Sequence, residues 1–157
     1  MILATLATLA TLLLTFAPPY EATVISVYDG DTITVRTTKT IKIRLDGIDA
    51  PELKQPFGQA SKQALSTLVF GKVILVKPKS KDRYGRTIAR LEADGIDVNL
   101  QMVATGHAHW YEQYAKNDMP LANAQAKAKA EKAGVWIDPN AIPPWEFRRK
   151  KPITKGE

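Results

Sequence analysis

Three acidic side chains stand where a turn and a proline would hold them in fixed positions. Asp31 follows Asp29-Gly30, a strong hairpin signal, and opens a strand, where aspartate is disfavoured. Asp49 and Glu52 flank Ala50-Pro51, and the proline stiffens the chain between them. Crowded carboxylates repel one another unless a proton or cation lies between them. Hard oxygen ligands of this kind suit Ca²⁺ or Mg²⁺.

Arginines accompany these carboxylates. Arg44 lies in the segment IRLDGIDAPE, just before the acidic loop, while Arg83 and Arg86 belong to DRYGR. A guanidinium group can bind a phosphate through two parallel hydrogen bonds. Together these groups meet the needs of phosphodiester hydrolysis. A cation and guanidinium groups neutralise the charge that grows on the phosphate oxygens, and a carboxylate orients or deprotonates the attacking water.

Each segment also has a purely structural interpretation. Asp29-Gly30 can be a hairpin turn with side-chain-to-backbone hydrogen bonds, and the other two segments can be solvated acidic and basic loops. The aromatic segment 107–114, HAHWYEQY, can pack in the core or provide platforms for bases. For His107 and His109 we favour packing or a surface position over metal binding. We expect Trp136 and Trp145 to anchor the C-terminal segment to the barrel.

Composition narrows the class of protein. The chain has 157 residues, 45% of them hydrophobic and 24% charged, which are values of a single globular domain. Cysteine is absent, which excludes disulfide scaffolds, Cys zinc sites, iron–sulfur clusters and thiol nucleophiles. Only two histidines are present, so one chain cannot build a multi-histidine metal site.

The two ends of the chain differ from the middle. Residues 1–19 are uncharged and mostly apolar, like the apolar region of an export signal. They lack the basic residues that normally stand before that apolar region. We therefore expect a signal-like segment and a secreted or periplasmic protein, with a membrane anchor as the alternative. Residues 148–157 form a basic tail with five Lys or Arg and one Glu, within a net charge of +6. Such a tail suits nucleic acid or an acidic membrane surface, or it simply aids solubility.

The hydrophobic pattern predicts five strands and three helices within residues 20–147. We expect strands over 21–28, 31–37, 40–46, 72–77 and 86–92, a polar loop from Lys77 to Gly85, and helices over 57–69, 98–105 and 119–133. Five short strands with a helix between the third and fourth are typical of an OB-fold barrel. The predicted fold class is thus α+β and mainly β: a five-stranded OB-fold barrel with three α-helices.

The motifs, taken in order, resemble the staphylococcal nuclease family. They are YDGDT, IRLDGIDAPE, DRYGR and GIDVNL, and the ending IPPWE is similar to the close of many bacterial members. The similarity covers roughly residues 20–149. It implies a calcium-dependent nuclease with one bound Ca²⁺ that cleaves DNA and RNA, preferably single-stranded, and leaves 3′-phosphates.

The resemblance also implies roles for individual residues. Asp31 and Asp49 match the calcium carboxylates, and Ala50 stands where a threonine lends its main-chain carbonyl to the metal. Glu52 matches the general base. Arg44 and Arg86 match the arginines that bind phosphate and stabilise the transition state. The residues expected to bind substrate are Arg83, Tyr84, Tyr111 and Tyr114, although the spacing leaves open whether Trp110 rather than a tyrosine stacks on a base.

Two other functions fit parts of the sequence. One is a catalytically silent OB-fold module that binds nucleic acid or a protein; the presence of all five key side chains argues against it. The other is a membrane-tethered basic protein that uses the leader and the tail. The sequence implies no protein partner, and we expect a monomer.

Overall fold

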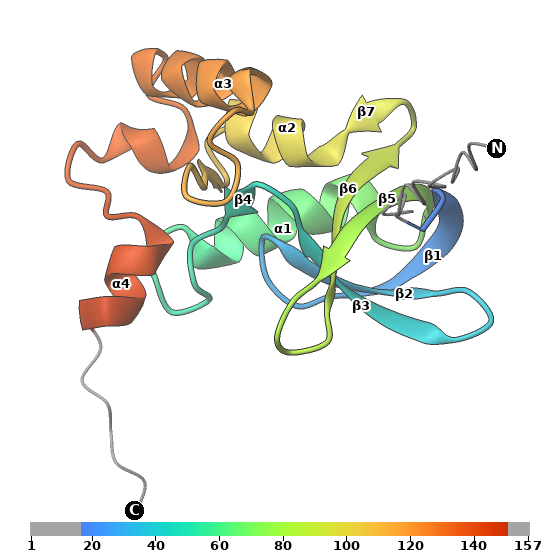
Figure 1. The fold of residues 1–157 in the computed structure, drawn as a ribbon. Coiled ribbons are helices and arrows are strands. Elements are labelled where there is room, and N and C mark those ends of the chain that lie inside the picture. Colours follow the sequence, from blue (N-terminus) through green and yellow to red (C-terminus); the bar gives the residue numbers. More distant parts are fainter. Residues whose placement is uncertain (1–16, 151–157) are drawn as a thin grey trace, which may run out of the picture.

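Alternation of buried and exposed residues builds the first three strands. The computed structural model describes residues 17–150 and places β1 (Tyr20–Val27), β2 (Thr32–Arg36) and β3 (Thr40–Leu45) in an antiparallel meander (Figure 1). Their inward-facing apolar residues form one side of the core and, apart from Ala22, are β-branched or leucine. They follow the period of two, except that a register shift between Val24 and Ser26 places Val27 inward. They are Ala22, Val24, Val27, Ile33, Val35, Ile43 and Leu45.

Two further strands close the sheet into a barrel. β5 (Val73–Lys81) pairs antiparallel with β1 and with β6 (Thr87–Ala93). β6 then pairs parallel with β3, with Arg44 opposite Ile88. A two-residue strand, β7 (Ile96–Asp97), extends the edge of β6. The predicted five-stranded barrel is confirmed.

The helices cover the barrel. α1 (Gly58–Val69) buries Leu65 and Val69 in the core, and α2 (Val98–Ala104) and α3 (Met119–Ala130) pack against each other. Asp97 and Asp118 cap α2 and α3, each carboxylate accepting a hydrogen bond from a backbone N–H in the first turn. A short 3₁₀ helix, η1 (Gly134–Ile137), follows α3. All three predicted helices are present.

A fourth helix, α4 (Pro144–Lys150), was not predicted. Proline near its start is favourable because the first backbone N–H groups of a helix have no partner within the helix. α4 lies beside the loop that joins β4 to α1, as Figure 1 shows. It includes residues 148–150, which the sequence analysis assigned to the basic tail.

A second sheet and a longer strand also differ from expectation. β4 (Ile48–Asp49) pairs with β8 (His109–Trp110), which places Asp49 opposite His109. β5 continues to Lys81, where the sequence analysis expected a loop from Lys77. Its pairing with β6 shifts register between Pro78 and Ser80. An irregularity of this kind accommodates a proline, which cannot donate a ladder hydrogen bond.

The predictions for the two ends fall mostly outside the described residues. Of the leader, residues 1–16 are not described, and of the basic tail, residues 151–157 are not described. Within residues 17–150, no helix combines the length and the apolar character needed to cross a bilayer.

Candidate active site

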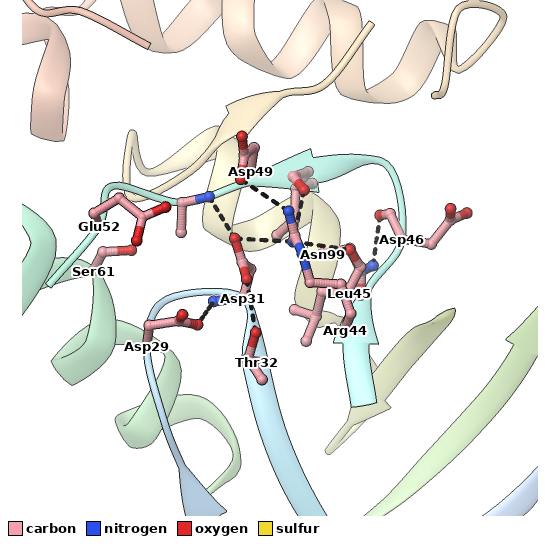
Figure 2. A network of polar contacts seen from close by, with 12 residues as sticks. Asp29, Asp31, Thr32, Arg44, Leu45, Asp46, Asp49, Glu52, Ser61 and Asn99 are labelled. Atoms are coloured by element: carbon pink, nitrogen blue, oxygen red, sulfur yellow. Dashed lines mark hydrogen bonds and ion pairs between the residues drawn. The ribbon is translucent and has the colours of Figure 1, made fainter. Parts of the chain in front are cut away.

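Arg44 joins two of the predicted carboxylates. Its Nη1 lies 2.9 Å from Asp31 Oδ2 and its Nη2 lies 2.8 Å from Asp49 Oδ1. Nη1 also donates a hydrogen bond of 2.9 Å to the Ile48 carbonyl. Figure 2 shows the three side chains pointing toward one another where β2, β3 and β4 meet. The two carboxylates are thus close enough to share one cationic group.

Asp31 is held by backbone as well as by Arg44. Its Oδ2 accepts a hydrogen bond of 2.7 Å from the Ala50 backbone N–H, and its Oδ1 accepts one of 3.0 Å from the Thr32 hydroxyl. The preceding residue, Gly30, leaves no room for a side chain, because a Cβ there would collide with Ser61 and Ala50. The hairpin that carries Asp31 is therefore fixed against both α1 and the acidic loop.

The site carries an excess of negative charge. We name Asp29, Asp31, Asp49 and Glu52 the acidic cluster (Figure 2). Burial, and then repulsion from Asp31, raises the pKa of Asp29 to about 7. Burial also raises the pKa of Asp49, although hydrogen bonds from Arg148 and the charge of Arg44 act in the opposite direction. Buried carboxylates in this position gain from an additional cation.

Arg44 keeps its charge despite burial. Burial alone would lower the pKa of its guanidinium, but the charges of Asp31, Asp49 and Asp29 more than offset this effect and raise the pKa. Its side chain is only 13% exposed. A buried guanidinium is therefore fixed at the centre of the acidic cluster.

Glu52 is positioned by the turn that follows it. Its backbone N–H donates to the Gln55 side-chain oxygen (3.1 Å), and the Gln55 N–H donates to the Glu52 carbonyl (2.8 Å). Gly58 lies against this carbonyl so closely that a Cβ would collide with it. The Glu52 carboxylate itself is about one-third exposed, so water can reach it.

Arg148 of α4 is the site residue that the sequence analysis missed. Its Nη2 lies 2.7 Å from Asp49 Oδ2, and its Nη1 donates to Glu52 Oε1 at 2.8 Å and to Asp49 Oδ1 at 3.3 Å. A Pro-Pro pair followed by an aromatic residue and two arginines was the available signal, because it indicates a short helix with a basic face. The prediction instead placed both arginines in the basic tail, so the helix and Arg148 were missed.

Arg86 lies apart from the acidic cluster. It directly precedes β6 and stands two residues before Ile88, the register partner of Arg44. Its Nε lies 2.6 Å from Asp82 Oδ2, and Asp82 Oδ1 accepts backbone hydrogen bonds from Tyr84 and Arg86. Among residues 17–150, no hydrogen bond or ion pair links Arg86 to the acidic cluster.

The other residues of the β5–β6 turn form an exposed group. The Arg83 guanidinium lies 4.8 Å from the centre of the Tyr84 ring and donates to its hydroxyl at 2.7 Å. Arg86 lies 5.7 Å from the same ring. Tyr84 is 69% exposed, so a ligand can reach both its ring and the arginines.

The aromatic residues of segment 107–114 divide into packed and exposed ones. His109 is buried with ring-edge contacts to Trp136 and Trp145, which confirms packing for this histidine. The two tryptophans thus hold the C-terminal segment against β8, which belongs to the second sheet and not to the barrel. Tyr111 stacks on Trp145. Tyr114 meets the edge of Tyr111 and is otherwise exposed. Trp110 is half-buried, and its indole N–H donates to the Ala115 carbonyl (3.0 Å).

The donor set fits a hard divalent cation at Asp31 and Asp49. Both carboxylates already face one positive group, and the Ala50 backbone lies against Asp31. Oxygen donors of this kind are the ligands that Ca²⁺ and Mg²⁺ prefer. Across residues 17–150, no three or more His, Asp or Glu side chains are gathered into a metal site; Glu52 instead faces Arg148.

Comparison with known proteins identifies the family. Residues 42–138 match the model described as staphylococcal nuclease homologue. The chain is 45% identical over 133 residues to an uncharacterized endonuclease of Haemophilus influenzae, covering 83% of this chain and 74% of that protein. It is 44% identical over 130 residues to an uncharacterized endonuclease of Escherichia coli (82% and 84% covered), and 38% identical over 141 residues to a micrococcal nuclease of Shigella flexneri (83% and 81%). The chain therefore belongs to the family of staphylococcal nuclease homologues.

Proposed function

We propose that this chain is a calcium-dependent nuclease that hydrolyses phosphodiester bonds of DNA and RNA. Its family and the names of its relatives support a nuclease, that is, a hydrolase acting on ester bonds. The observation that carries the proposal is the convergence of Asp31, Asp49 and Arg44 beside Glu52. This arrangement combines oxygen ligands, a fixed guanidinium and a water-accessible carboxylate.

Each side chain has one task in the proposed reaction. Arg44 and Arg86 neutralise the negative charge of the phosphate as it grows. Glu52 takes a proton from the attacking water, whose oxygen forms the new bond to phosphorus. Asp31, Asp49 and the Ala50 carbonyl would hold Ca²⁺, which when bound supplies positive charge next to the phosphate. Cleavage of the P–O5′ bond leaves a 3′-phosphate and a 5′-hydroxyl.

Substrate selection would depend on phosphate and on stacking. Phosphate contacts carry no sequence information, so we expect little sequence preference. Tyr84, Arg83 and Tyr114 are exposed and can meet unstacked bases. Tyr111, the other tyrosine assigned to substrate binding, has one ring face against Trp145. Stacking on exposed rings favours single strands.

We further propose that the protein works as a monomer, either secreted or periplasmic, or held at a membrane by its N-terminal segment. The apolar, uncharged residues 1–19 support the location. Signal cleavage is tested by sequencing the N-terminus of the protein recovered from the producing cells.

Digestion of circular single-stranded DNA tests the function. The wild type should cut the circle with calcium and not with a chelator, and the linear products should carry 3′-phosphates. Glu52→Gln should lose about 10²- to 10⁴-fold in rate, the usual contribution of a general base, while DNA binding persists. Glu112→Gln, at an exposed position, is the matched control.

Three outcomes would contradict the proposal or favour one of its alternatives. Full activity of Glu52→Gln would refute its role as the base. A wild type that binds the circle without cutting it, with calcium present, would favour the silent OB-fold module. Lipid association that persists after mutation of Asp31 and Asp49 would favour the membrane-tethered alternative.

A further inference from the structure

The guanidinium of Arg148 lies where a cation bound by Asp49 would have to compete with it. We propose that Arg148 is an internal counterion that pairs with Asp49 and Glu52 in the metal-free protein and that divalent cations displace. This inference rests on the proposed function, because it assumes that Asp49 is a cation ligand. The chain itself would therefore supply a positive group that competes with the cation for Asp49.

The contacts of Asp49 leave little room for both positive charges. Its side chain is 1% exposed, and its Oδ1 already accepts from Arg44. Arg148 occupies Oδ2 at 2.7 Å and also reaches Oδ1 at 3.3 Å. A bound cation would be a third positive group on this buried carboxylate, and the two guanidinium groups would repel it strongly, since water screens charges poorly there. Binding of a cation to Asp49 therefore favours departure of one guanidinium.

Arg148 is the guanidinium that can leave. Arg44 is 13% exposed, belongs to a barrel strand and also donates to the Ile48 carbonyl. Arg148 is 43% exposed. Within the described part of the chain, its guanidinium group pairs with Asp49 and Glu52 only. Rotation of one side chain into water would release both carboxylates.

The rest of α4 is held independently of Arg148. Trp145 stacks on Tyr111, and the Gln55 side chain donates to the Ile142 carbonyl at 2.8 Å. The helix can therefore stay docked while the arginine side chain moves. Release of Arg148 also frees Glu52, the proposed base, so cation binding and exposure of the base would be coupled.

Calcium titration of the metal-free protein by calorimetry tests the inference. Arg148→Ala should bind calcium at least about fivefold more tightly than the wild type, the lower end of common coupling strengths. Arg149→Ala is the matched control: it removes the same charge from the next residue of α4, and it should change calcium affinity much less. Arg148→Lys keeps the charge but loses the two-pronged contact, so its affinity should lie between those of the wild type and Arg148→Ala.

Thermal unfolding separates competition from a merely structural anchor. Without calcium, Arg148→Ala should unfold at a lower temperature than the wild type, because Asp49 loses one of its two cationic partners and Glu52 loses its ion pair. In saturating calcium this difference should shrink or vanish. If Arg148 were only a structural anchor, Arg148→Ala would lower the unfolding temperature equally with and without calcium, and that result would overturn the inference. Equal calcium affinities of the wild type and Arg148→Ala would also overturn it.

Failure of the proposed function would look different. If neither the wild type nor Arg148→Ala binds calcium, the cation site itself is wrong and the inference falls with it. If only Arg148→Ala binds, the inference is supported in its strongest form. Asp31→Asn in the Arg148→Ala background should abolish binding, which would locate the cation at this site.

Discussion

The indole ring of Trp145 lies parallel to the phenol ring of Tyr111, with ring centroids 5.0 Å apart and planes 1° apart. Trp145 comes from α4 and Tyr111 from the segment after β8, so the stack joins the end of the chain to the edge of the site. It covers one face of Tyr111. Tyr114, which is 66% exposed, is more accessible to a base than Tyr111.

Replacement of Trp145 should destabilise the protein. Trp145→Ala loses the stack on Tyr111 and the edge contact with His109, and aromatic pairs contribute about 0.5–1.5 kcal/mol each beyond burial. We expect a decrease in the free energy of unfolding of at least about 1 kcal/mol, measured by urea denaturation. Tyr114→Ala removes one edge contact from an exposed ring, so it should lower the free energy of unfolding less than Trp145→Ala does. Equal effects would mean that α4 is not anchored by this stack.

Asp82 should matter for turnover through Arg86. Arg86→Ala should lower the rate about 10²- to 10³-fold if the guanidinium stabilises the transition state. Asp82→Asn removes the charge that holds Arg86 Nε, so we expect a smaller loss, about tenfold or one step of 1.4 kcal/mol. Rates on single-stranded DNA at saturating calcium measure both.

The matched control for Asp82 is Asp138→Asn. Asp138 is an exposed aspartate that accepts a backbone hydrogen bond within its own turn, and it lies outside the site. If Asp82→Asn cleaves as fast as Asp138→Asn, the ion pair with Asp82 does not position Arg86. Normal cleavage by Arg86→Ala would show that its phosphate contact is wrong.

The raised pKa of Asp29 predicts that the free energy of unfolding falls as the pH rises. Burial and the charge of Asp31 disfavour the charged form of Asp29 and raise its pKa in the folded protein from the usual 3.8 to about 7. The folded protein therefore binds this proton more tightly, and stability falls between about pH 4 and 7. In chelator, Asp29→Asn should remove this fall and gain at least about 1 kcal/mol on the wild type between pH 4 and 8. Parallel pH curves for the two proteins would contradict the assignment.

The lowered pKa of His109 predicts the opposite effect: the free energy of unfolding falls as the pH decreases. Burial, with a smaller effect of Lys129, lowers its pKa from 6.5 to about 4. The folded protein keeps the ring neutral, so the stabilising contribution is complete above pH 6.5 and is lost as the pH falls toward 4. His109→Phe should remove this acid-side loss, seen as a gain over the wild type of at least about 1 kcal/mol at pH 4 relative to pH 7. Denaturation at the two pH values measures it; an unchanged difference would show that His109 does not titrate on unfolding.

Local signals were sufficient to predict the barrel. Asp29-Gly30 and Asp94-Gly95 mark turns, and alternation of apolar residues marks the strands. The pair of β4 with β8 was not predictable in this way, because each strand has two residues and too short a pattern to detect. Only tertiary packing brings His109 opposite Asp49.

In the site, too, residues that lie close together in the sequence were predictable, and a residue from a distant part of the chain was not. Asp31, Arg44, Asp49 and Glu52 lie within one stretch of sequence with clear turn chemistry, and the structure brings them together. Arg148 reaches Asp49 from 99 residues away along the chain. No short-range pattern reports such a partner. Arg86 was expected beside the phosphate site, yet its contacts are with its own turn.

Gly30 has a consequence for how this scaffold could be altered. No side chain fits between Gly30 and its neighbours Ser61 and Ala50. The hairpin therefore packs directly against α1 and the acidic loop. The framework thus fixes the spacing between Asp31 and Asp49, the two carboxylates proposed to bind the cation. To change the preferred cation at the proposed site, the side chains themselves would have to be replaced.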